Sequence, residues 1–143
     1  MLMSEFQHNI DKKGRIFIPA KLREDLGDGF VLSKALDSSK CLFIYPADEW
    51  RKLVQKISEL PFSKARTLQR YLYAGAVEAS CDTQGRILLP PVLRAFAELN
   101  EETTATIVGA ANRIEIWNTD NWLRETQNIS QDEILSILEE CEL

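Results

Sequence analysis

The chain of 143 residues has few of the side chains that metal sites and nucleophilic catalysis require. It has one histidine, His8, and three widely spaced cysteines, Cys41, Cys81 and Cys141, with no CxxC pair. Zinc sites and disulfide frameworks need clustered or paired ligands, so we expect reduced structural thiols, no metal and no cofactor. GxSxG and glycine-rich phosphate loops are also missing, so we expect no enzymatic activity and no small-molecule substrate.

Long apolar runs are absent as well. No stretch approaches the ~20 apolar residues that cross a bilayer. The first residues do not form a basic region followed by an apolar one, as a signal peptide would. We therefore expect a cytoplasmic protein with no membrane partner.

The net charge of −5 argues at first against a nucleic-acid partner, but the charges are unevenly distributed. Residues 1–74 hold 13 basic and nine acidic side chains, whereas residues 75–143 hold four basic and 13 acidic ones. The two parts carry +4 and −9. This asymmetry is compatible with one face for an acidic partner and another face for solvent or further subunits.

An internal repeat organises the chain. The segment 10–23, IDKKGRIFIPAKLR, returns 71 residues later as the segment 81–94, CDTQGRILLPPVLR. A second similarity, at an offset of 72, joins residues 42–45 to residues 114–117. The repeat predicts two units and two connecting parts: unit 5–48, a helical linker over 49–75, unit 76–120 and a helical tail over 121–143.

Each unit is expected to contain a hairpin around an Asp-x-x-Gly turn, a short helix that begins after a proline, and a second hairpin. So few short strands bury too little apolar surface to fold alone. We therefore expect an α+β protein in which duplicated β-hairpin and short-helix units interleave into one barrel-like core with flanking helices.

The connecting parts have helical patterns. Apolar residues at helical spacing from Trp50 to Leu60 predict a first linker helix, which Pro61 ends. A second linker helix is expected over 63–73, with its basic residues facing solvent or an acidic partner; these are Lys64, Arg66 and Arg70. In the tail, a capping box from Ser130 to Glu133 precedes an apolar stripe. We expect this stripe to pack on its own chain or on a neighbouring chain.

The motif Asp-x-x-Gly-Arg with a downstream Pro-x-x-x-Arg, present twice in a chain of this length, resembles the MraZ family over essentially the whole sequence. The resemblance implies two AbrB-like swapped-hairpin halves, a ring-shaped homo-oligomer and association with the nucleoid. It also implies regulation of transcription through double-stranded DNA, at direct repeats upstream of the division and cell-wall gene cluster. Ser4 departs from the family pattern, which usually has a glycine near the start.

The resemblance maps the family's Asp-x-x-x-Arg motif onto two turns of this chain. Arg15 and Arg86 each follow a tight turn, where a planar guanidinium suits phosphate oxygens or the acceptor pair of guanine. Lys12 and Lys13 add charges for phosphates, whereas the second turn has Thr and Gln in their place. We predict that these four basic residues bind DNA.

Four further residues are predicted to support the motif. Asp11 and Asp82 are expected to orient the arginines or to cap the turns, and Gly14 and Gly85 are expected to supply a positive φ. The alternative is a salt-bridged turn that serves only folding. A turn has no need of arginine at both places, which favours binding.

Other residues and functions remain as alternatives. Arg23 and Arg94 lie near helix ends, where a structural role is at least as well supported as DNA contact. His8 is expected to be a half-buried packing residue. Two alternatives compete with DNA-binding regulation, namely an antitoxin-like interaction protein and a structural ring protein whose arginines bind other subunits.

Overall fold

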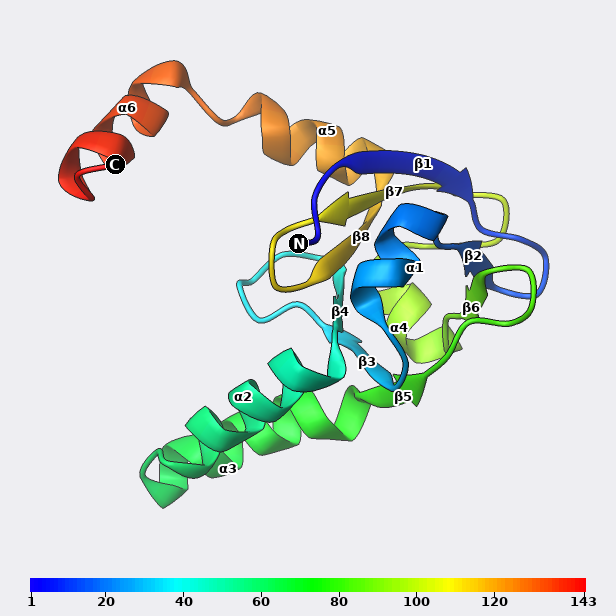
Figure 1. Ribbon diagram of the computed structural model, residues 1–143, viewed down its shortest axis with the longest axis horizontal. Coiled ribbons are helices and arrows are strands. Elements are labelled where there is room, and N and C mark those ends of the chain that lie inside the picture. Colours follow the sequence, from blue (N-terminus) through cyan, green and yellow to red (C-terminus); the bar gives the residue numbers. More distant parts are fainter.

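The computed structural model describes residues 1–143 (Figure 1). The strands are β1 (Glu5–Asn9), β2 (Arg15–Phe17), β3 (Phe30–Lys34), β4 (Leu42–Tyr45), β5 (Val77–Ala79), β6 (Arg86–Leu88), β7 (Thr104–Gly109) and β8 (Ile114–Asn118). The helices are α1 (Ala20–Leu26), α2 (Ala47–Ser58), α3 (Phe62–Leu72), α4 (Pro91–Phe96), α5 (Thr119–Gln127) and α6 (Gln131–Glu140), with a short 3-10 turn η1 (Tyr73–Gly75). The same order of strands and helices occurs twice, and the predicted α+β class is confirmed.

Strands of the two repeats alternate in space. Six strands form an antiparallel sheet in the order β1-β7-β8-β4-β3-β5, and β2 pairs with β6 in a separate two-stranded ribbon. Strand β1 of the first repeat therefore pairs with β7 of the second, β5 pairs with β3, and β4 pairs with β8. Neither repeat contains a complete sheet, so the two depend on each other for folding.

The strand pairing corrects the prediction that each Asp-x-x-Gly turn joins the two strands of a hairpin. The second hairpins, β3–β4 and β7–β8, form as predicted. The strands on either side of each Asp-x-x-Gly turn do not pair with each other, because β2 and β6 pair across the repeats instead, with Ile16 opposite Ile87. Both isoleucines are fully buried, which is the physical gain of this exchange.

One core serves both repeats. It is a cluster of 19 buried residues drawn from the sheet, the ribbon and the short helices α1 and α4. Leu22 of α1 and its counterpart Leu93 of α4 are each 1% exposed within this cluster. The helices cover the core at positions fixed by the prolines that precede them, Pro19 and Pro90.

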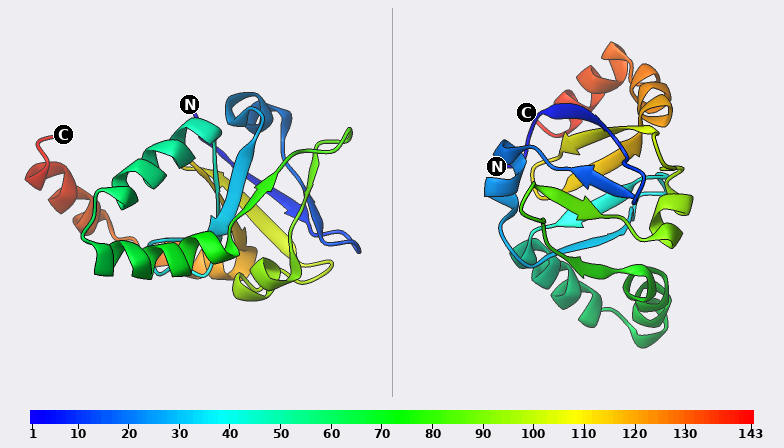
Figure 2. Two further views of the ribbon diagram at one scale, coloured as in Figure 1. Left: turned by 90° about the horizontal axis from the view of Figure 1, so that it is seen from below. Right: turned by 90° about the vertical axis from the view of Figure 1, so that its right-hand side faces the viewer.

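Two helical projections are anchored on the other face of the sheet. Trp50 of α2 packs on Tyr45, with ring centroids 5.5 Å apart, and Trp122 of α5 packs on Trp117 at the same separation. Helices α2 and α3 form the arm, residues 47–72, and helices α5 and α6 with the last residues form the tail, residues 119–143. Both project from the end of the molecule opposite to β2 and β6, as Figures 1 and 2 show.

This placement decides two expectations about the helices. The basic residues Lys64, Arg66 and Arg70 lie on the arm, far from the Asp-x-x-Gly turns, so they do not adjoin the predicted DNA face. In the tail, the hydroxyl of Ser130 accepts a hydrogen bond from the backbone N–H of Glu133 at 3.1 Å and caps α6. Every residue of α6 is exposed, so its apolar stripe does not pack on its own chain.

None of the helices has the length and the apolar character that a membrane span requires.

Candidate nucleic-acid interface

The turn of the first repeat is held by one carboxylate. Oδ1 of Asp11 accepts hydrogen bonds from the backbone N–H groups of Lys13 and Arg15, both at 2.9 Å. Its Oδ2 accepts a bond from Nε of Arg15 at 2.8 Å. Asp11 therefore caps the turn and fixes the direction of the arginine at the same time.

The turn of the second repeat has the same network. Oδ1 of Asp82 accepts from the backbone N–H groups of Gln84 and Arg86, both at 2.9 Å. Its Oδ2 accepts from Nε of Arg86 at 2.9 Å. Two turns 71 residues apart thus present arginines in equivalent poses, with the terminal nitrogens free of the local carboxylate.

The ribbon brings these arginines onto one surface. Arg15 lies opposite Leu88 in the register of β2 and β6, and Phe17 lies opposite Arg86. Side chains alternate along a strand, so these four share the face opposite to the buried isoleucines. Nη1 of Arg86 is also 3.9 Å from Oδ2 of Asp11, which links the two turns.

The arginines are held rather than freely mobile. The side chain of Arg15 is 27% exposed and that of Arg86 is 28% exposed. Half-burial together with the Nε contact restricts the guanidinium groups while leaving their outer edges accessible. Such a pair is suited to bidentate recognition of an anion or a base edge.

Hydrogen bonding keeps both carboxyl groups ionised. Burial raises the pKa of Asp11, but bonds donated by the backbone and side chain of Arg15 and by the backbone of Lys13 outweigh it, so the pKa falls below its ordinary value of 3.8. The backbone N–H of Arg86 is the largest cause of the lowered pKa of Asp82. At neutral pH each arginine therefore faces a carboxylate.

Each turn is also closed by the other repeat. The backbone N–H of Leu89 donates to the carbonyl of Gly14, and that of Ile18 donates to the carbonyl of Gly85, both at 2.9 Å. The two glycines have φ of 80° and 82°, a conformation that other residues adopt only with strain. The predicted need for glycine is therefore met at both turns.

Arginines of the short helices complete this crossed arrangement. Arg94 of the second repeat lies over Gly14 of the first, and Arg23 of the first lies over Gly85 of the second. Arg23 donates from Nη1 to the carbonyl of Ile18 at 2.7 Å, and Arg94 donates from Nε to the carbonyl of Leu89, the equivalent residue, at 3.0 Å. Both arginines therefore have a structural contact.

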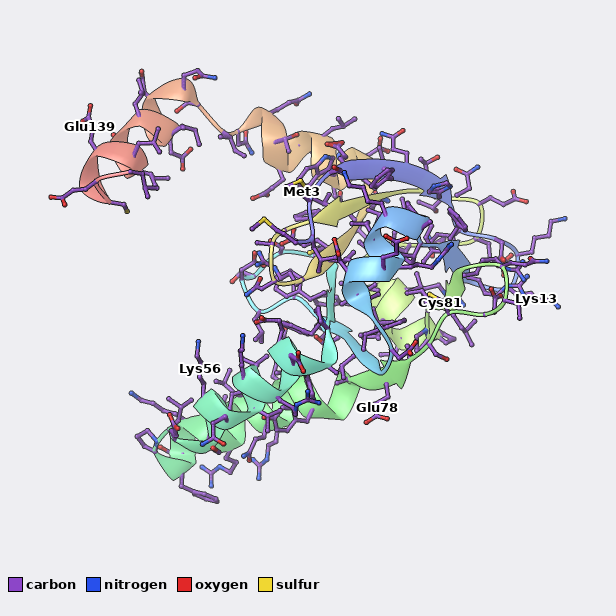
Figure 3. All side chains as sticks on the ribbon, viewed as in Figure 1. Met3, Lys13, Lys56, Glu78, Cys81 and Glu139 are labelled. Atoms are coloured by element: carbon purple, nitrogen blue, oxygen red, sulfur yellow. The ribbon has the colours of Figure 1, made fainter.

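The first turn carries the larger positive charge. Lys12 and Lys13 are exposed at its tip, and Figure 3 shows Lys13 at the extreme end of the molecule. With Asp11 and Arg15 the first turn carries +2, whereas Asp82 and the rest of the second turn sum to zero. The structure brings the predicted residues of both turns to one end of the fold.

Sequence reasoning missed two apolar members of this surface. Phe17 packs between the ring of His8, at a centroid distance of 4.9 Å, and the guanidinium carbon of Arg23, 5.2 Å from its centroid. Leu88 is 59% exposed beside the arginines. Phe17 and Leu88 each follow an arginine by two residues, which is the spacing of side chains on one face of a strand. This spacing could have indicated them only if the pairing of β2 with β6 had been known.

The cysteines and the possible metal ligands are distributed over the chain. Among the thiols, Cys41 is buried, Cys81 is half-buried and Cys141 is exposed, and all are free. Burial raises the pKa of Cys41 and of Cys81, so neither is an activated nucleophile. No three histidine, cysteine, aspartate or glutamate side chains gather as metal ligands would.

The interleaved repeats and the paired Asp–Arg turns define the class: an internally duplicated chain that presents a rigid, cationic β-ribbon. The family model described as "MraZ protein, putative antitoxin-like" matches residues 1–70 and 72–140. The chain belongs to the MraZ family, because the two matches together cover almost its whole length.

Comparison with individual proteins gives the same family. The chain is 50% identical over 126 residues to the transcriptional regulator MraZ of Desulforamulus reducens, covering 87% of this chain and 86% of the relative. It is 52% identical over 124 residues to that of Pelotomaculum thermopropionicum, covering 85% and 83%. With the protein of the same name from Halothermothrix orenii it shares 46% identity over 144 residues and 98% of both chains.

Proposed function

We propose that the chain is a sequence-specific DNA-binding transcriptional regulator that meets double-stranded DNA with the outer face of the β2–β6 ribbon. The observation that carries the proposal is the pair Arg15 and Arg86, each fixed by its own aspartate and placed diagonally on one face of the ribbon by the pairing of β2 with β6. The names of the relatives, all transcriptional regulators, support the same function and favour a non-catalytic role.

The geometry suits the major groove. A two-stranded β-ribbon fits this groove, which is about 12 Å wide. Because Asp11 and Asp82 occupy the Nε groups, the outer guanidinium nitrogens of Arg15 and Arg86 remain as paired donors for a guanine edge or a phosphate. Lys12 and Lys13 then lie where the phosphate backbone flanks the groove, and contribute affinity rather than sequence preference.

We further propose how the chain is organised around this interface. Units 5–48 and 76–120 form the ribbon between them, while the linker 49–75 and the tail 121–143 serve assembly. Several subunits in a closed homo-oligomer, most simply a ring, then bind several operator repeats at once, and avidity compensates for a small contact per subunit. The operator is then expected to consist of short direct repeats upstream of the division and cell-wall gene cluster, within the nucleoid, as the resemblance to the MraZ family implies.

A gel-shift titration of the chain against its own upstream genomic DNA tests the proposal. A shifted complex that survives excess unrelated duplex supports it. Binding of duplex without sequence preference, or no binding, would contradict it and would favour the two alternatives. An antitoxin-like protein would instead capture a partner protein, and a structural ring would assemble but shift no DNA.

A further inference from the structure

The arm and the tail are the same element in two copies of the repeat. Helix α2 corresponds to α5 at an offset of 72, since Trp50 on Tyr45 matches Trp122 on Trp117. Helix α3 then corresponds to α6. The two projections are nevertheless packed very differently, and this difference is informative.

Helix α3 has a partner that α6 lacks. Ala65 of α3 is 6% exposed in a cluster with Ile57 of α2, so the arm is a closed pair of helices. Ala65 is the fourth residue of α3, and the fourth residue of α6 is Ile134, which is 40% exposed. Its apolar neighbours on α6 are also open to solvent: Leu135 is 53% exposed, Ile137 47% and Leu138 38%.

A helix in this position needs a surface to pack on. Helix α6 has 10 residues, and isolated helices shorter than about 12–15 residues are marginal in water. Most helical stability comes from packing of the apolar face. The stripe on α6 is therefore expected to be covered by another molecule.

The charges of the two projections are opposite. The tail carries seven acidic side chains and one basic one, a net of −6, whereas the arm carries six basic and three acidic side chains, a net of +3. None of the tail's acidic residues forms a salt bridge within the chain, and neither do four of the arm's cations, Lys56, Lys64, Arg66 and Arg70. Figure 3 shows Lys56 and Glu139 on separate projections, both remote from Lys13.

The arm also offers apolar surface beside its free cations. Phe62, Arg66 and Arg70 follow at four-residue spacing and share one face of α3. Phe62 is 76% exposed, and the guanidinium carbon of Arg66 lies 5.4 Å from its ring centroid. An apolar ring flanked by cations complements an apolar stripe flanked by carboxylates such as Glu139 and Glu140.

We propose that the acidic tail of one molecule docks onto the basic arm of a second copy of this chain, with the α6 stripe packed against α3. The contact joins two different surfaces, so it is heterologous and propagates from copy to copy into a ring or a filament. This inference rests on the proposed homo-oligomer and names the surfaces that build it. It leaves the β2–β6 ribbon free at the opposite end of each subunit.

Two charge-reversal variants and their mixture test the docking. Glu139→Lys with Glu140→Lys makes the tail less acidic and places cations in the last turn of α6, which suits the helix dipole. Arg66→Glu with Arg70→Glu makes the arm less basic. Light scattering should show the wild type as an assembly and each variant shifted toward the 16.3 kDa monomer.

Mixing the two variants should restore the assembly, because each reversed surface then finds a complementary one on the other variant. A tail that folds back on its own arm would remain disrupted in the mixture. An unrestored mixture, a reversed variant that stays fully assembled, or a wild type that is monomeric at micromolar concentration would therefore overturn the proposal.

Three controls complete the test. Glu24→Lys with Glu78→Lys makes the same change of net charge as the tail variant, at exposed sites of the body, and should leave the assembly intact. Lys12→Glu with Lys13→Glu should also keep the assembled mass while weakening DNA binding, so a failure of DNA binding and a failure of docking are distinguishable. If circular dichroism shows a reversed variant to be unfolded, the glutamine versions of the same pairs replace it. These must raise the protein concentration needed for assembly, and an unchanged concentration would refute the docking.

Discussion

Arg94 of the second repeat closes over Gly14 of the first, so that a β-carbon on Gly14 would lie 2.8 Å from its Nε. Gly14 also has φ of 80°. The turn that presents Arg15 is thus held by a residue 80 positions away in sequence. The proposed DNA face therefore depends on contacts between the two repeats.

We predict that Gly14→Ala destabilises the fold more than Gly29→Ala does. Both glycines have positive φ, which costs an alanine about 1–2 kcal/mol. A β-carbon on Gly29 would meet nothing within 4 Å, so Gly29→Ala isolates this backbone cost. Gly14→Ala must in addition displace Arg94. Denaturant unfolding of both variants measures the difference, and equal losses of stability would show that the Arg94 contact is not tight.

The lowered pKa values of Asp11 and Asp82 predict how the turns respond to acid. A depressed native pKa adds stability above the unfolded value of 3.8, and this stability is lost as the pH falls through the native pKa. A variant with Asp11→Asn and Asp82→Asn lacks these carboxylates. The wild type should therefore be more stable than this variant at neutral pH, and should lose the extra stability only below about pH 4. Thermal unfolding across pH tests this, and a constant difference down to about pH 2 would exclude the assignment.

Lys12 and Lys13 should contribute charge rather than sequence preference. Each phosphate contact releases counterions and adds roughly 0.9 to the slope of log affinity against log salt. Lys12→Ala with Lys13→Ala should flatten this slope while leaving the ranking of DNA sequences nearly unchanged. Lys21→Ala with Lys40→Ala provides a matched control, since it removes the same charge at exposed sites outside the first turn and the arm. An unchanged slope in the double variant would show that the first turn does not contact the phosphates.

Much of the fold follows from the sequence because the repeat is explicit. The equivalence of residues 10–23 and 81–94 predicts two like units, and the small size of each unit predicts a common core. The pairing of Ile16 with Ile87 could not be read locally. A strand of three residues fits a neighbour within its own hairpin or in the other repeat equally well, and only burial in the shared core decides between them.

The candidate site was predictable in its residues but not in its construction. The spacing of Asp11 and Arg15 suggests a turn with a fixed arginine. It contains no information about the neighbouring Phe17 and Leu88 or about the crossed contacts of Arg23 and Arg94, because these depend on strands from the other repeat. The direction of the arm was not predictable either, because it is set by the packing of Trp50 of α2 on Tyr45 of the sheet.

Substitution of the two turn arginines tests the central claim most directly. In a gel shift with the chain's own upstream DNA, Arg15→Ala should abolish specific binding while the unfolding temperature changes little, because lost base contacts cost about 1–3 kcal/mol per subunit and multiply through an assembly. Arg86→Ala should weaken binding less, since the second turn lacks neighbouring lysines. Normal DNA binding by Arg15→Ala, together with a lowered unfolding temperature, would show instead that the paired Asp–Arg turns serve only the fold.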